Sequence, residues 1–254
     1  MAKVLEICVD SLASARAAIR GGADRLELCC ALAVGGLTPY EALLRQIRVE
    51  SDIPVRCLMR PRAGDFLYTP EELAMLADQI LQLKAAGADG FVIGCLTAEG
   101  DLDNDAMKPL IEACGSCGIT LHRCIDVSRD PVQTYLEAGK LGIDTVLTSG
   151  GAGNCLAGME TIGKMLRLNG PQVLIGAGVK ASVIRKFREA FPEAEAFHMS
   201  GKCEIESGMI FRREGVPWAC RAWMNGISSR PLKKPSGKPG PLCTNKNWAD
   251  LGIS

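Results

Sequence analysis

The sequence predicts an α/β protein with a TIM-like (β/α)8 barrel, and two observations lead to this fold class. Short apolar segments alternate with longer segments of helical periodicity, and this unit recurs eight times within 254 residues. Repeated βα units of this kind close into a parallel barrel. An open doubly wound sheet is the alternative, but no Gly-x-Gly-x-x-Gly follows the first predicted strand, and the length suits a single barrel.

Eight short apolar runs are predicted as strands. They cover residues 4–9, 25–30, 55–60, 90–95, 119–124, 144–149, 172–177 and 194–199. In the first two runs, polar residues alternate with leucine and isoleucine. Because successive side chains of a strand point to opposite faces, Glu6, Glu27 and Cys29 should face the barrel interior. The adjacent Cys30 should point elsewhere, so the two neighbouring cysteines are not expected to share a metal.

Seven segments with helical periodicity lie between these strands, at 11–21, 38–50, 69–86, 103–116, 130–141, 155–168 and 180–191. Thr38-Pro39 and Thr69-Pro70 each place a capping residue before a first-turn proline. Three helices end in a glycine that is followed two residues later by aspartate, at Gly22, Gly87 and Gly142. Glycine at this position indicates a left-handed helix end.

The last βα unit is irregular in sequence. Residues after the eighth strand lack clear helical periodicity, and residues from about 227 onwards are rich in proline, glycine and lysine. We therefore expect one barrel domain at 1–226 and a C-terminal tail at 227–254 that belongs to the same unit.

The composition excludes several functional classes. Lys+Arg and Asp+Glu both total 29, so no basic surface indicates nucleic-acid binding. No uncharged apolar run is long enough for a membrane span, and the N-terminal residues do not resemble a signal peptide. These features predict a cytosolic protein. In a cytosolic chain of this size, the twelve cysteines are expected to be mostly reduced, buried thiols.

Candidate catalytic groups follow from the rule that barrel chemistry lies at the C-terminal ends of the strands. Both histidines of the chain fall there, and two glutamates face inward; the catalytic candidates are Glu6, Glu27, His122 and His198. Buried carboxylates need partners, which Arg25, Arg60 and Arg62 can supply. Two interpretations remain open: a structural ion-pair network, or a carboxylate with a raised pKa that acts as an acid or base.

Glycine-rich turns at the ends of the sixth, seventh and eighth strands suggest an anion site, because such turns expose backbone amides. Glycine also simply forms tight βα turns, so a structural interpretation is equally open. With the three arginines, the predicted substrate- or anion-binding residues are Asp65, Arg123, Asp126, Thr148, Ser149, Gly150, Gly176, Gly178 and Ser200.

Six sequence motifs, taken in their order along the chain, resemble those of the CutC copper homeostasis protein family. They are RLELCCALAVGGLTP, MRPRAGDFLYTPEEL, GADGFVIGCLTAEGDLD, LHRCIDVSRDP, VLTSGGAG and HMSGK, and the resemblance extends from about residue 4 to 216. It implies a TIM-barrel-like fold, a cytosolic homodimer or higher homo-oligomer, and a link to copper. Cys29 occupies the cysteine of the family's Glu-Leu-Cys phrase and is the metal-ligand candidate that the resemblance carries over. Cys57 is a speculative second ligand, although its strand position faces the helices.

Three functions remain open from the sequence. The first is copper(I) binding or trafficking, and the second is an enzyme that acts on a small anionic metabolite by acid–base chemistry. Arginines would hold a phosphate or carboxylate in that enzyme, and no lysine lies on a predicted strand interior for Schiff-base chemistry. The third is a scaffold without activity. Whether the chain is an enzyme is left undecided by the sequence.

Overall fold

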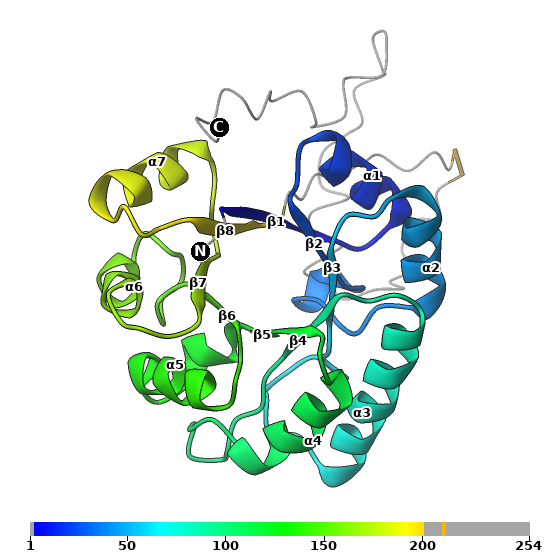
Figure 1. The fold of residues 1–254 in the computed structure, drawn as a ribbon, viewed down its shortest axis with the longest axis horizontal. Helices are drawn as coiled ribbons and strands as arrows, with labels where there is room; N and C mark the ends of the chain where they lie inside the picture. The colour runs from blue at the N-terminus through cyan, green and yellow to red at the C-terminus, as the bar shows by residue number, and fades with distance from the viewer. Residues whose placement is uncertain (1–2, 201–209, 212–254) are drawn as a thin grey trace, which may run out of the picture.

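Eight parallel strands close into a barrel in the computed structural model, which describes residues 3–200 and 210–211 (Figure 1). The strands pair in chain order, and β8 pairs with β1 to close the barrel. They are β1 (Val4–Val9), β2 (Arg25–Leu28), β3 (Val55–Leu58), β4 (Gly90–Ile93), β5 (Gly118–Leu121), β6 (Thr145–Thr148), β7 (Gln172–Ile175) and β8 (Ala196–Met199). The predicted fold class is confirmed.

Helices surround the barrel and follow the first seven strands (Figure 1). They are α1 (Leu12–Arg20), α2 (Glu41–Glu50), α3 (Pro70–Ala85), α4 (Asn104–Cys114), α5 (Pro131–Lys140), α6 (Met159–Leu166) and α7 (Ala181–Ala190). Short 3-10 turns, η1 (Leu32–Val34) and η2 (Arg123–Val127), follow β2 and β5. Every strand and helix predicted from the sequence is present. Most strands end about two residues earlier than predicted.

The two predicted threonine caps have different outcomes. Thr69 caps α3 as expected: its side chain accepts from the Glu72 amide, and the Glu72 carboxylate accepts from the Thr69 amide. The prediction that Thr38 caps α2 is wrong, because α2 begins at Glu41. Thr38 instead donates its hydroxyl to the carbonyl of Arg60 and accepts the Arg60 amide. The residue therefore ties the loop after β2 to the end of β3.

The repeated glycine-x-aspartate phrase closes the lower, N-terminal end of the barrel. Gly22, Gly87 and Gly142 all have positive φ, as predicted. Asp24 donates its amide to the carbonyl of Leu5, and its carboxylate accepts the amide of the same residue at 2.7 Å. Asp89 and Val55, and Asp144 and Ile119, repeat this reciprocal pair. The same reciprocal pair of hydrogen bonds therefore closes three βαβ units.

Apolar side chains form an outer core between strands and helices and smaller clusters inside the barrel. Cys57 packs in the outer core, whereas Cys8 and Cys29 pack with Leu58 and Val92 in an inner cluster. Among the described residues, no helix is long and apolar enough to cross a membrane. The proposed tail at 227–254 and nearly all of the irregular unit at 201–226 lie outside the described residues.

Candidate functional site

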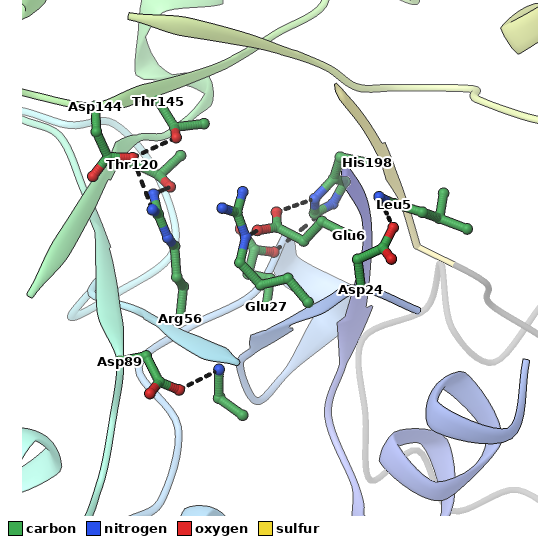
Figure 2. A network of polar contacts seen from close by, with 12 residues as sticks. Leu5, Glu6, Asp24, Glu27, Arg56, Asp89, Thr120, Asp144, Thr145 and His198 are labelled. Atoms are coloured by element: carbon green, nitrogen blue, oxygen red, sulfur yellow. Dashed lines mark hydrogen bonds and ion pairs between the residues drawn. The ribbon is translucent and has the colours of Figure 1, made fainter. Parts of the chain in front are cut away.

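A buried polar network occupies the barrel interior where β8, β1 and β2 meet (Figure 2). Glu6 lies opposite Arg25 on one neighbouring strand and opposite His198 on the other. Arg25 Nε donates to Glu6 Oε2 at 2.5 Å, and His198 Nδ1 lies 2.8 Å from Glu6 Oε1. The sheet register therefore places one carboxylate between two cationic side chains, and the predicted inward direction of Glu6 is confirmed.

Glu27 lies on the other side of His198. Its Oε2 is 3.8 Å from His198 Nε2, so the imidazole lies between two carboxylates. Both glutamates are buried, and the His198 side chain is only 12% exposed. The Arg25 Nη2 atom is also buried and has no hydrogen-bond partner among the described residues. The network is therefore tight around Glu6 and less satisfied at its edges.

Two cysteine sulfurs complete this cluster. Cys8 is the register partner of Glu27, and its Sγ lies 3.6 Å from Cys29 Sγ. Both cysteines are buried and free. Gly36, in the loop after β2, covers Cys29: a methyl group at Gly36 would lie 3.6 Å from the Cys29 sulfur. Cys8, Cys29, Glu27 and His198, which we call the sulfur cluster, thus come from β1, from β2 and the residue directly after it, and from β8.

Burial and the neighbouring charges shift the protonation of Glu6 and His198 in opposite directions. Burial would raise the pKa of Glu6, but hydrogen bonding to His198 and the charge of Arg25 outweigh it and lower the pKa to about 2. Burial would lower the pKa of His198, but the Glu27 and Glu6 carboxylates outweigh it and raise the pKa. Glu6 is therefore a carboxylate at neutral pH, and the two glutamates favour the protonated form of His198.

Glu27 and Cys8 retain protons more strongly than usual. Burial and the Glu6 charge raise the pKa of Glu27 above its ordinary value of 4.5, although His198 opposes the shift. The hydrogen bond to Cys29, burial and the Glu27 carboxylate raise the pKa of the Cys8 thiol well above 9.0. Cys8 is consequently a thiol, not a free thiolate nucleophile, unless a cation replaces its proton.

His122 and Arg60 lie together elsewhere at the barrel mouth. The rings of Phe66 and His122 are 4.8 Å apart, and the Arg60 guanidinium lies 5.5 Å from the Phe66 ring centre. Burial, together with the Arg60 charge, lowers the pKa of His122 to about 3, so the ring is neutral. Its Nδ1 accepts the Cys124 amide, and its Nε2 has no partner among the described residues. Arg60 donates to the carbonyls of Val34, Gly36 and Gly64.

The turn after β6, expected to expose amides to an anion, surrounds an internal carboxylate. Asp126 Oδ1 accepts the Thr148 hydroxyl at 2.6 Å and the amides of Ser149 and Gly151 at 2.9 and 3.1 Å. Arg123 Nε donates to the other oxygen of Asp126 at 2.7 Å and Nη2 to the Ser149 hydroxyl at 2.9 Å. An external anion at this turn would have to compete with Asp126.

The remaining predicted residues are distributed around the rim. Arg62 pairs with Asp65 and Glu72 in a half-exposed group outside the barrel interior. The Gly176 amide donates to the Thr148 carbonyl, whereas Gly178 has φ +80° in the turn after β7. Gly150 donates its amide to the Thr148 hydroxyl. Ser200 is exposed at the end of the continuous described segment. The structure thus does not bring these residues into one anion site.

Cys8 was not recognised from the sequence, although it lies two residues after Glu6 and therefore on the same face of its strand. Cys57, the speculative second ligand, faces the helices and is incorrect as a partner for Cys29. Cys8, Glu27 and His198 each offer one ligand atom, and these three atoms lie within 4.8 Å of one another. Sulfur, carboxylate and imidazole at this separation can hold a metal ion.

Comparisons with known proteins agree on one family. The family model described as "CutC family" matches residues 3–202. A "family protein CutC" of Xanthomonas campestris pv. campestris is 43% identical over 200 residues, which are 78% of this chain and 83% of that protein. The Homo sapiens "Copper homeostasis protein cutC homolog" is 36% identical over 215 residues, 84% of this chain and 78% of the relative.

A solved structure supports the same grouping. It is titled a putative copper homeostasis protein CutC from Streptococcus agalactiae, with a TM-score of 0.72 and 25% sequence identity. The similarity covers 77% of this chain and 97% of the solved one.

Proposed function

The chain belongs to the CutC family, a copper homeostasis family, and from this premise we propose that it binds copper(I) through Cys8 and Cys29. The observation that carries the proposal is the 3.6 Å separation of the two sulfurs inside the barrel. Thiolates are the ligands that copper(I) prefers, and two of them are sufficient to hold the ion. His198, which is 12% exposed and lies on the strand next to that of Cys8, is available as a third donor.

The register favours metal binding over a disulfide. Cys8 lies opposite Glu27, so Cys29 is displaced from it by two residues along the neighbouring strand. A diagonal pair of this kind has Cα atoms about 7–8 Å apart, which exceeds the span of an unstrained disulfide. An ion between the sulfurs can bridge this separation without backbone movement. The proposal requires reduced thiols and therefore includes the cytosolic location expected from the sequence.

Copper(I) titration of the reduced protein against a competing chelator tests the proposal. We expect a single tight site that Cys8→Ser or Cys29→Ser weakens by at least about tenfold, because a hydroxyl is a poor copper(I) ligand. Cys30→Ser is the matched control. Its thiol donates to the Thr38 carbonyl at 3.1 Å, away from the cluster, so the variant should keep the affinity.

Three further cysteines, Cys203, Cys220 and Cys243, lie outside the described residues. A variant with serine at all three positions should also retain the tight site. Loss of tight binding in this triple variant, or unchanged affinity in Cys29→Ser, would refute the assignment to the barrel. Circular dichroism of each variant separates loss of a ligand from loss of the fold.

An enzyme acting on a small anionic metabolite is the second candidate. One observation favours it: His122 Nε2 and Arg60 Nε are buried nitrogens without a partner among the described residues. Both could bind a carboxylate or phosphate. We expect an anionic metabolite that binds there to raise the melting temperature of the wild type but not of His122→Phe. A metabolite screen in which no compound discriminates between the two proteins removes this candidate.

The homo-oligomer implied by the family resemblance is also part of the proposal. Light scattering coupled to size-exclusion chromatography should give a mass of at least twice the chain's 27.1 kDa. A mass equal to one chain at micromolar concentration would contradict it.

A further inference from the structure

We propose that the sulfur cluster is also a four-donor site for a divalent metal of the zinc type, in which Glu27 is the ligand that determines acceptance of the 2+ ion. The donors are the sulfurs of Cys8 and Cys29, a carboxylate oxygen of Glu27 and Nε2 of His198. This inference deepens the proposed function, because it rests on the same two thiols, and it adds selectivity between metals.

Two of the donor separations are close to the edges of a zinc tetrahedron. Zinc–sulfur bonds of about 2.3 Å give sulfur–sulfur edges of about 3.8 Å, and bonds of about 2.0 Å to nitrogen and oxygen give edges of about 3.3 Å. The Cys8 and Cys29 sulfurs are 3.6 Å apart, and His198 Nε2 is 3.8 Å from Glu27 Oε2. Cys8, Glu27 and His198 contribute ligand atoms that all lie within 4.8 Å of each other. Small side-chain rotations would therefore complete the tetrahedron.

The surrounding residues already orient the imidazole as in protein metal sites. Histidine ligands commonly donate their second ring nitrogen to a carboxylate, which fixes the ring and strengthens the metal bond. His198 Nδ1 lies 2.8 Å from Glu6 Oε1, so Nε2 is left facing Glu27 (Figure 2). Arg25 Nε in turn holds the other oxygen of Glu6 at 2.5 Å. The cluster thus has both donors and a second layer of support.

The ligand preferences of the metal ions explain why Glu27 should favour a divalent ion over copper(I). Two thiolates suffice for copper(I), which prefers soft sulfur and gains little from a carboxylate. Zinc(II) and cobalt(II) are borderline ions that accept sulfur, imidazole and carboxylate together. Glu27 lies opposite Cys8 in the sheet, and its carboxylate supplies the oxygen ligand that a four-coordinate 2+ ion accepts and that copper(I) does not need.

Cobalt(II) is the probe, because tetrahedral cobalt with sulfur ligands has intense ligand-field and charge-transfer bands. Anaerobic titration of the reduced wild type should give these bands at one equivalent, and zinc(II) should displace them. Glu27→Gln should weaken cobalt(II) and zinc(II) binding by at least about 100-fold while its copper(I) affinity stays within about threefold, since only the hard donor is lost.

Glu6→Gln is the matched control, because it removes a buried carboxylate that orients His198 and is not itself a ligand. It should weaken divalent binding by about 10–100-fold while retaining the tetrahedral spectrum. Equal divalent affinity in wild type and Glu27→Gln overturns the inference, as does a wild type without tetrahedral bands. Failure of copper(I) binding with intact cobalt(II) binding would refute only the proposed function.

X-ray absorption of the zinc-loaded wild type provides a test that needs no folded variant. The expected first shell contains two sulfurs at about 2.3 Å and two nitrogen or oxygen atoms at about 2.0 Å. A shell of sulfur alone would place the ion on other cysteines and overturn the inference.

Discussion

His198 Nδ1 lies 2.8 Å from Glu6 Oε1, although the two residues are 192 positions apart in the chain. This contact joins the first and last strands where the barrel closes, and both residues are direct partners in the sheet. Arg25 binds the opposite side of the same carboxylate. The contact that closes the barrel therefore also holds one wall of the candidate metal site.

Replacement of Glu6 should separate these two roles. Glu6→Gln leaves Arg25 and His198 in a buried setting without their shared countercharge, and breaking a buried pair in this way costs about 3–5 kcal/mol of unfolding free energy. Urea denaturation measures the loss. Glu50→Gln, which breaks an exposed pair with Arg16, should have a far smaller effect. Equal losses in the two variants would contradict a stabilising role for the buried network.

The lowered pKa of His122 predicts how the free energy of unfolding changes with acid. The pKa of His122 is about 3 in the folded protein and 6.5 ordinarily, so the unfolded chain binds its proton first. The contribution of neutral His122 to the free energy of unfolding is complete above pH 6.5. It is lost as the pH falls from 6.5 towards 3, by up to about 1.4 kcal/mol per pH unit.

A comparison of wild type with a His122 variant between pH 6.5 and 5 isolates this group, because Glu27, whose pKa is raised above 4.5, contributes equally to both proteins. Glu6, with a pKa lowered to about 2, loses its contribution only as the pH falls from its ordinary value of 4.5. His198, with a raised pKa, contributes fully below 6.5 and loses stability as the pH rises. Urea denaturation of wild type and His122→Asn across this interval should give a shallower dependence in the variant. Parallel curves would show that His122 is not the titrating group.

The Asp126 carboxylate occupies a group of donors that could otherwise bind an external anion. Asp126→Ala removes the acceptor of the Thr148 hydroxyl and of two turn amides, so we expect a loss of about 2–4 kcal/mol. The vacated donors should then bind sulfate, which would raise the melting temperature of the variant more than that of the wild type at equal ionic strength. Asp65→Ala, in an exposed pair with Arg62, is the control. Equal sulfate effects in all three proteins would contradict a preformed anion cradle.

The sequence predicts the barrel well because each βα unit carries its own local signals. Glycine at 22, 87 and 142 and the Thr69 cap act within a few residues, and strand alternation places Glu6, Glu27 and Cys29 on the inner face. The pairing of Cys8 with Cys29 depends on register between strands 21 residues apart. Alternation alone does not specify that register, so the site was predicted with only one of its sulfurs.

The same limit explains the turn after β6. Glycine and threonine there indicate an anion site, but the partner carboxylate of Asp126 lies 22 residues before Thr148. Whether a nest of amides receives a ligand or a side chain of its own chain is decided by tertiary packing. Thr38 is similar: its local pattern predicts a helix cap, and its actual partner is the distant Arg60.

The loop after β2 offers a last prediction about the metal cluster. Gly36 has φ +90°, and a methyl group there would lie 2.8 Å from Leu58 Cδ2 and 3.6 Å from Cys29 Sγ. Gly142 has a similar φ of +78°, but a methyl group there would meet nothing within 4 Å. Gly142→Ala should therefore lose about 1–2 kcal/mol from backbone strain alone, and Gly36→Ala a further 1–3 kcal/mol from overpacking.

Copper(I) affinity distinguishes the two substitutions more sharply than stability does. Gly36→Ala pushes Leu58 and the loop against Cys29, which should displace its sulfur from Cys8 and weaken copper(I) binding by about tenfold or more. Gly142→Ala lies at the opposite end of the barrel and should leave the affinity unchanged. Because both substitutions impose similar backbone strain, equal copper(I) affinities would mean that the sulfur separation does not control binding, and the Cys8–Cys29 site would then be untenable.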